Sequence, residues 1–259
     1  MEPTRFNRQA WDNIARSPKR WFTPASDAEI AAARRGDVRI RLTATQTIPP
    51  AWYEPVCGKR ILALAAAGGH QGPVLAAAGA KVTVVDFSEG QLEIDRQLAE
   101  RHALELELIC ADMADLTELE SGRFDLVIHP TSVNFVADVR PVWREAARVL
   151  HPGGVLISGF LQPVNFLFDA VARDKGKLKV RFSIPYNDLQ LPAEEREQTL
   201  GPQRPIDFGH SLTDLLGGQL DAGLMITDLL EDRWGGKDAL SERIATFMAT
   251  RSIKPQQTA

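Results

Sequence analysis

The most informative stretch of the sequence is RILALAAAGGHQGPVLAAAGAKVTVVDFSEGQL, residues 60–92. It predicts an apolar strand at 60–66, a turn of small residues, a helix over about 70–78 and a second apolar strand at 81–86, which ends in the carboxylate of Asp86. Small residues let a backbone approach a ligand closely at the start of a helix, and a carboxylate about 20 residues further on can accept hydrogen bonds from both ribose hydroxyls. The stretch therefore predicts a site for a nucleotide-like cofactor.

The alternation of strands and helices continues beyond this stretch. The next expected elements are a helix over about 88–102, strands at 105–110 and 124–129, a helix over about 138–149 and a strand at 154–160, with Gly153 and Gly154 as the turn into it. Runs such as VTVVDF and FDLVIH are almost continuously apolar, which is typical of strands buried on both faces. This order predicts an α/β protein with a doubly wound, mostly parallel sheet and helices on both faces.

Two segments outside the repeating part have a different character. Residues 1–55 predict an N-terminal helical cap or lid, with one helix over about 7–15 and another that starts at Ser26, has Glu29 three residues later and ends at Gly36. Residues 162–208 contain five prolines and a possible strand pair at 177–186, so we expect an inserted segment that covers the substrate. The core then comprises 56–161 and 209–259, completed by a helix over about 211–220 and two strands within 225–234 and 243–253.

Composition argues against several functions. A net charge of −4 and a pI near 5.8 do not favour binding of nucleic acid. No apolar run approaches the ~20 residues of a membrane helix, and the N-terminal residues lack the features of a secretory signal. Scattered histidines and two separate cysteines, Cys57 and Cys110, predict neither a metal site nor a structural disulfide. We expect a cytoplasmic protein that is a monomer or homodimer.

The order of these motifs resembles that of the class I S-adenosylmethionine (SAM) dependent methyltransferases. The resemblance covers residues 55–160 and 210–253 and depends on the turn at 65–69, Asp86, the pair Asp112-Met113, FDLVIHP and RVLHPGGVLISGF. It implies a Rossmann-like sheet of seven strands, the last two forming an antiparallel hairpin at one edge. The commonest first motif of the superfamily is hydrophobic-Leu-Asp-Leu-Gly-Cys-Gly-x-Gly, and here Ala63, Ala65 and Ala67 replace its acidic residue and two glycines. The segment LAAAGGHQGP is instead similar to the LAxGGGxQGP motif of a bacterial branch, mostly without assigned substrates.

The resemblance also implies SAM as the cofactor, bound at the carboxyl ends of the strands. Asp86 would accept from the ribose, Asp112 would accept from the adenine amino group, and Met113 would pack on the ring. The amides of Gly68 and Gly69 would contact the methionine part. The full set of expected cofactor-binding residues is Ala65, Ala67, Gly68, Gly69, Gln71, Asp86, Phe87, Ser88, Gln91, Asp112, Met113, His129 and Asn134.

The methyl acceptor is expected beside the end of the fourth strand. His129 lies there and is a candidate general base because an unperturbed histidine has a pKa of about 6.5, although a histidine at a strand end is also often scaffolding. Further candidates for substrate or lid contacts are Trp11, Trp21, Tyr186 and His210. We expect methyl transfer to a small-molecule acceptor. Two alternatives stay open: a catalytically inactive methyltransferase-like module that binds SAM or acts as a sensor, and a nicotinamide-dependent oxidoreductase, against which the missing G-x-G-x-x-G spacing argues.

Overall fold

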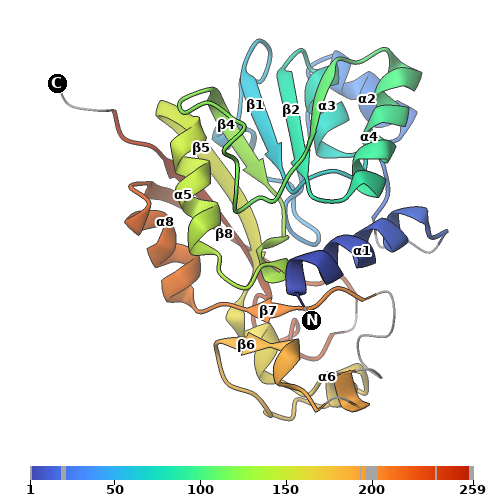
Figure 1. Ribbon diagram of the computed structural model, residues 1–259, viewed down its shortest axis with the longest axis vertical. Coiled ribbons are helices and arrows are strands. Elements are labelled where there is room, and N and C mark those ends of the chain that lie inside the picture. The colour runs from blue at the N-terminus through green and yellow to red at the C-terminus, as the bar shows by residue number, and fades with distance from the viewer. Residues whose placement is uncertain (1, 19–21, 193, 197–203, 237, 257–259) are drawn as a thin grey trace.

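A single seven-stranded sheet forms the centre of the molecule (Figure 1). The computed structural model describes residues 2–18, 22–192, 194–196, 204–236 and 238–256. The strand order is β3-β2-β1-β4-β5-β9-β8, in which the first five strands are parallel and β9 runs antiparallel to both of its neighbours, β5 and β8. The strands are β1 (Arg60–Leu64), β2 (Lys81–Asp86), β3 (Leu106–Cys110), β4 (Phe124–His129), β5 (Leu150–Leu161), β8 (Met225–Asp232) and β9 (Phe247–Ile253). This arrangement confirms the predicted doubly wound sheet with an antiparallel hairpin at one edge.

Helices cover both faces of the sheet because alternate side chains of its central strands are apolar on each side. Ile61 and Ala63 of β1 belong to one buried cluster, while Leu62 and Leu64 belong to the other. The first cluster includes residues of α2 (Asp27–Arg34), α3 (Gln71–Ala77) and α4 (Glu89–His102), and the second includes residues of α5 (Arg140–Val149). None of the described helices is long and apolar enough to cross a membrane.

The start of β5 differs from the prediction. The strand begins at Leu150 rather than at 154, and its register against β4 shifts between Phe124 and Leu126. Gly153, with φ +86°, lies inside this irregular part of the strand. The predicted turn at Gly153-Gly154 is therefore wrong, because the chain accommodates the two glycines as a distortion of the ladder.

The N-terminal segment contains two helices, as predicted. Helix α1 (Pro3–Arg16) is longer than expected because Glu2 caps it, accepting from the backbone amides of Thr4 and Arg5. Helix α2 has the predicted capping box, in which Ser26 and Glu29 bind one another's backbone amides. Asn7 on α1 is fully buried and donates to the carbonyl oxygens of Phe135 (3.0 Å) and Ile206 (3.1 Å), so this helix is tied to the end of the sheet.

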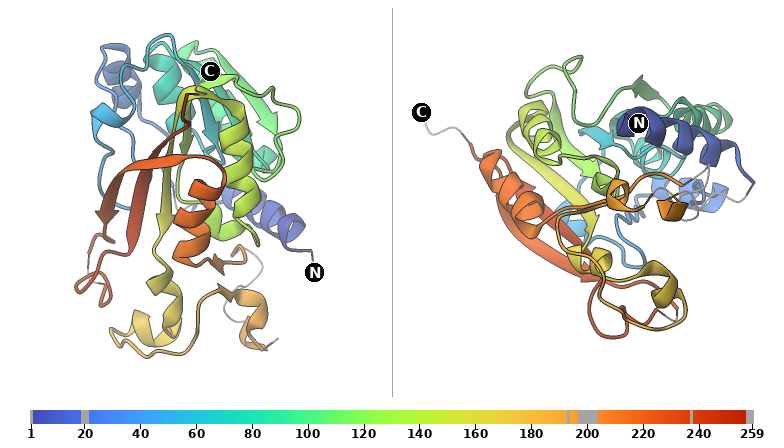
Figure 2. Two further views of the ribbon diagram at one scale, coloured as in Figure 1. Left: turned by 90° about the vertical axis from the view of Figure 1, so that its left-hand side faces the viewer. Right: turned by 60° about the horizontal axis from the view of Figure 1, so that its bottom comes forward.

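The described part of residues 162–208 lies below the sheet, at the end of the molecule where α1 also lies (Figures 1 and 2). The described part contains a 3₁₀ turn (Pro163–Leu167), α6 (Ala170–Asp174) and β6 (Tyr186–Asn187), which pairs with β7 (Phe208–Gly209). The strand pair expected within 177–186 is wrong, since Val180 only bridges to Phe168 and Tyr186 pairs with Gly209.

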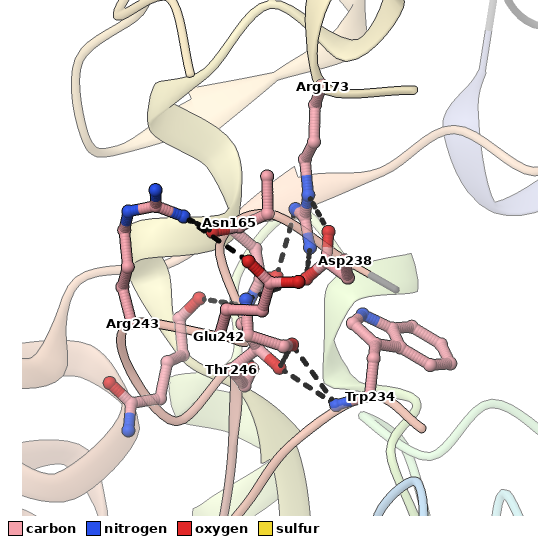
Figure 3. A network of polar contacts seen from close by, with 10 residues as sticks. Asn165, Arg173, Trp234, Asp238, Glu242, Arg243 and Thr246 are labelled. Atoms are coloured by element: carbon pink, nitrogen blue, oxygen red, sulfur yellow. Dashed lines mark hydrogen bonds and ion pairs between the residues drawn. The ribbon is translucent and has the colours of Figure 1, made fainter. Parts of the chain in front are cut away.

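A polar network anchors this segment to the loop between β8 and β9 (Figure 3). The guanidinium of Arg173 donates from Nε and Nη2 to the two carboxylate oxygens of Asp238, each at 2.9 Å. Asn165 donates from Nδ2 to the backbone oxygen of Thr246 at 2.6 Å.

The predicted helix over about 211–220 is also present, with a π-helical stretch (Thr213–Gly217) before α8 (Gly218–Asp221).

Candidate cofactor and acceptor site

A cavity of about 200 Å³, here called the inner cavity, lies where β1, β2 and β4 end. Its walls come from α1, the turn after β1, the end of β2 and the loops after β3 and β4. The expected cofactor-binding residues that line it are Ala65, Ala67, Gln71, Asp86, Phe87, Gln91, Asp112 and Met113. The remaining lining residues are Thr4, Trp11, Phe22, Ala66, Ala111, Pro130, Thr131, Ser132, Phe135 and Val136.

Asp86 contributes a buried carboxylate to the wall of the inner cavity. Its Oδ1 accepts from the amide of Ser88 at 3.0 Å, and its Oδ2 accepts from the amide of Ala67 at 3.4 Å. Burial raises the pKa of this carboxyl to about 6. Each oxygen keeps a further lone pair, so the side chain can accept from two hydroxyl donors of a ligand.

The turn between β1 and α3 requires small residues, as the sequence predicted. Gly68 and Gly69 have φ of +107° and +82°, and an added Cβ would lie 2.8 Å from Gln91 Oε1 at the first and 2.9 Å from Ile94 at the second. Ala65 also has a positive φ, +47°, which is a conformation that favours glycine. Of the three alanines in the altered first motif, Ala65 is the one in this conformation.

Asp95 is the main feature of the turn that sequence reasoning missed. Its Oδ2 accepts from the amides of Gly68 (2.7 Å) and Gly69 (2.9 Å), and the side chain is fully buried. These two amides are therefore engaged by a protein carboxylate rather than available to a ligand, contrary to the prediction. A signal was present, because Asp95 follows Gln91 by one turn on the apolar face of α4 that also carries Leu92.

His129 is not placed as a general base. Its ring is fully buried, with Nδ1 hydrogen bonded to Ser158 Oγ (3.0 Å) and Nε2 to Ser132 Oγ (3.1 Å). Burial lowers its pKa to about 3, so the ring is neutral. The alternation of β4 directs the side chain to the α5 face, where it packs edge-on against Trp143, and it does not line the inner cavity. The predictions that His129 acts as a general base and contacts the cofactor are therefore wrong. Its ring instead supports Ser132 and Met113, both of which line the inner cavity.

Ser88 likewise has a structural role. It is fully buried, accepts from the amide of Gln91 as the N-cap of α4, and donates to Asp12 Oδ1 at 2.6 Å. The inner cavity does not include it. Ser88 is therefore the N-cap of α4 and not the cofactor contact expected from the sequence.

A second cavity of about 740 Å³, here called the outer cavity, adjoins the first. The two share the wall residues Trp11, Phe22, Ala67, Gln71, Pro130, Thr131 and Phe135. Aromatic side chains of Trp234 and Phe247 and charged side chains of Glu29, Arg41, Arg204 and Asp207 line the rest, together with Gly68, His70 and Asn134. A ligand in the outer cavity would thus lie directly beside one in the inner cavity.

Asn134 belongs to the outer cavity rather than to the inner one. Its Nδ2 donates to Asp207 Oδ1 at 2.7 Å, and Arg204 donates to Asp207 Oδ2 at 3.2 Å. Burial raises the pKa of Asp207 to about 6. Sequence reasoning missed Asp207, because no periodic pattern surrounds it.

Of the four expected substrate or lid residues, the three that the structure describes are not brought together. Trp11 lines both cavities, and Trp21 lies outside the described residues. Tyr186 lines a third cavity, of about 590 Å³, within the inserted segment, where its hydroxyl donates to Asp188. His210 donates from Nε2 to the backbone oxygen of Val133 at 2.9 Å and lines none of the three cavities. Among the described residues, no group of three or more side chains is arranged to hold a metal ion.

Comparisons with known proteins agree with this geometry. Residues 62–158 match a family of methyltransferase domains. Over 249 residues the chain is 43% identical to an uncharacterized methyltransferase of Bacillus subtilis strain 168, YbaJ, which covers 96% of this chain and 97% of that protein. A demethylmenaquinone methyltransferase of Clavibacter sepedonicus is 40% identical over 110 residues, 42% of this chain and 44% of that protein.

A solved structure shows the same fold. The SAM-dependent methyltransferase of Mesorhizobium loti superposes with a TM-score of 0.60 at 20% identity, over 78% of this chain and 94% of that one. The fold, the family match and the identity to a methyltransferase over almost the full chain lead to one assignment. This chain belongs to the class I SAM-dependent methyltransferases.

Proposed function

We propose that this methyltransferase transfers the methyl group of SAM, held in the inner cavity, to a small molecule held in the outer cavity. The observation that supports this most is that the two cavities share a wall at the carboxyl ends of β1 and β4. Ligands of doubly wound sheets bind at this edge. Neither the sensor nor the oxidoreductase alternative is favoured by the relatives, which are named as methyltransferases.

The inner cavity has the groups that a SAM molecule requires. Asp86 accepts from the ribose hydroxyls, while Phe87 and Met113 form apolar walls for the adenine ring. Asp112 Oδ1 already accepts from the amide of Ala114 at 2.9 Å, which leaves Oδ2 for the adenine amino group. When bound there, SAM supplies an electrophilic methyl group on a sulfonium.

The outer cavity has the size and lining of a small-molecule site. Residues 204–207 of the inserted segment and Trp234 enclose it, and Trp11 and Phe135 form the apolar junction with the inner cavity. Holding the acceptor at this junction and excluding water supplies much of the rate enhancement of a displacement reaction. The match to a demethylmenaquinone methyltransferase supports a small-molecule acceptor.

Asp207 takes the place of His129 as the candidate proton acceptor. Its carboxylate lies in the wall of the outer cavity, oriented by Asn134 and Arg204. With a pKa raised to about 6, it is ionised at neutral pH and basic enough to receive the proton that an acceptor hydroxyl or amine releases.

We place the reaction in the cytoplasm, since Cys57 and Cys110 are both free thiols. A monomer or homodimer stays a prediction.

A labelling experiment tests the proposal. The protein is incubated with SAM carrying a tritiated methyl group and with either the low-molecular-mass or the macromolecular fraction of a bacterial extract. We expect label in the small-molecule fraction, lost in Asp86→Ala and retained in Glu118→Ala, which removes an exposed carboxylate away from both cavities. Label in protein or RNA would contradict the small-molecule acceptor, and no label in either fraction would favour the inactive module.

A further inference from the structure

The turn that forms the floor of the cofactor site is held by two buried carboxylates from different elements. Three consecutive amides are engaged: that of Ala67 by Asp86, at the end of β2, and those of Gly68 and Gly69 by Asp95, on α4. Asp86 lines the inner cavity, whereas Asp95 does not. Asp95 therefore does not touch a ligand in the inner cavity, and its hydrogen bonds reach that ligand through the backbone of the turn.

The position of Asp95 is unfavourable unless its hydrogen bonds are needed. The side chain has no exposed surface, and its Oδ1 lacks a hydrogen-bond partner in the described part of the chain. Burying a carboxylate oxygen without a partner costs free energy. An apolar side chain at this position would continue the buried face of α4 formed by Leu92, Leu98 and Ala99 and would avoid that cost. Gly72 leaves room for the carboxylate, because an added Cβ there would lie 3.2 Å from Asp95 Oδ1 and 2.7 Å from Val84.

The backbone of the turn depends on this contact. Gly68 and Gly69 both have positive φ, and glycine is the residue with the largest conformational freedom to lose on ordering. Residue 63 of β1 is alanine and offers no carboxylate from beneath the turn. Two hydrogen bonds from one rigid helix remove the freedom of both glycines at once.

We propose that Asp95 is a positioning residue for the cofactor: by fixing the amides of Gly68 and Gly69 it sets the place of Ala67 and, through the Ala67 amide, the orientation of the Asp86 carboxylate. This role rests on the cofactor site proposed above. It predicts that an oxygen acceptor, rather than a negative charge, is what residue 95 has to provide. Burial raises the pKa of Asp95 to about 7, which agrees with a site that tolerates the neutral form.

The test is the affinity for S-adenosylhomocysteine (SAH), measured by calorimetry below the unfolding temperature of every variant. Asp95→Ala removes the acceptor and should weaken SAH binding at least tenfold. Asp95→Asn keeps an oxygen that can accept both amides and should bind SAH within about threefold of the wild type. Leu98→Ala is the matched control, because it truncates a buried side chain one turn along the same helix; it should lower the unfolding temperature and leave SAH affinity unchanged.

Each result decides between a positioning and a merely structural role. Wild-type affinity in folded Asp95→Ala, or equal losses in Asp95→Ala and Leu98→Ala, would overturn the proposal. An Asp95→Asn variant as weak as Asp95→Ala would show that the charge is required and would also overturn it. If the wild-type protein binds no SAH, the cofactor site itself is refuted. This outcome is distinct from the others because it is seen in the wild type alone, without comparing the variants.

Discussion

Ala65 carries the strain that the altered first motif introduces. Its φ of +47° costs a non-glycine residue about 1 to 2 kcal/mol. A glycine would avoid this strain, but its more flexible unfolded chain would offset about 0.5 to 1 kcal/mol of the gain. Ala65→Gly should therefore raise the free energy of unfolding by about 0.5 to 1 kcal/mol, measured by urea denaturation. Ala66→Gly is the control: Ala66 is buried without a positive φ and should lose stability, so equal effects at the two positions would contradict the assignment of strain.

Asp207 makes the reaction rate sensitive to pH. As a base it acts ionised, and burial raises its pKa to about 6, so kcat/KM for the acceptor should fall about tenfold for each pH unit below 6. Asp207→Asn should be slower at neutral pH and lack this limb of the profile. A limb that persists in Asp207→Asn would assign the titration to another group. His129 cannot be that group, because its pKa is lowered to about 3 and its ring is therefore neutral throughout this pH range.

The residues missed in the sequence are those whose role depends on tertiary contacts. Asp86 could be predicted because it ends an apolar strand at a known distance from a small-residue turn. Asp95 required knowledge of which face of α4 meets the turn, and Asp207 lies between prolines and a two-residue strand. His129 was predicted at the right strand end, with a catalytic and a scaffolding role both open. One residue of register decides which face of the sheet a side chain takes, and the structure directs this ring to the α5 face.

Helix α1 is the element that joins the cofactor site to the inserted segment. Asn7 donates to the carbonyls of Phe135 and Ile206 and accepts from the amide of Ile206 at 2.7 Å, all in a buried position. Asn7→Ala should cost about 2 to 3 kcal/mol, because buried backbone groups of Ile206 lose their partner. Hydrogen exchange should quicken in α1 (Pro3–Arg16) and around Ile206, but not in α2 (Asp27–Arg34).

The control for this effect lies on the same helix. Gln9→Ala removes an exposed side chain whose hydrogen bond is to Asn13, and it should leave exchange in α1 close to that of the wild type. Exchange that is unchanged in Asn7→Ala, or equally fast in both variants, would show that Asn7 does not anchor the helix.

Long periodic elements were predictable, and short ones were not. The apolar runs of β1, β2 and β4 and the capping box of α2 specify their elements locally. Strand β5 begins early because its ladder absorbs two glycines, which in sequence indicate a turn. The pair β6 and β7 has two residues in each strand, too few for any alternation, so only tertiary pairing defines it.

Asp95 makes the stability of the entire protein depend on pH. Its pKa is about 7 in the folded protein and about 4 in the unfolded chain, so between these values the folded state holds a proton that the unfolded state has released. The free energy of unfolding contributed by Asp95 is therefore highest at low pH and is lost as pH rises from about 4 to 7.

Comparison with Asp95→Asn isolates this contribution from the other titrating groups. Between pH 5 and pH 8, the stability of Asp95→Asn relative to the wild type should improve by about 2.5 kcal/mol, since one pKa unit corresponds to about 1.4 kcal/mol. Urea denaturation at both pH values measures the difference. A difference that is constant with pH would show that Asp95 titrates normally in the folded protein.

Calorimetric titration of the wild type and of Asp86→Ala with SAH shows whether the inner cavity holds SAM with Asp86 on the ribose. We expect micromolar binding by the wild type. In the variant we expect a loss of about tenfold to a hundredfold, because hydrogen bonds to a charged group are worth about 1.5 to 3 kcal/mol. If the wild type binds no SAH, or Asp86→Ala binds it with equal affinity, this assignment of the inner cavity is wrong.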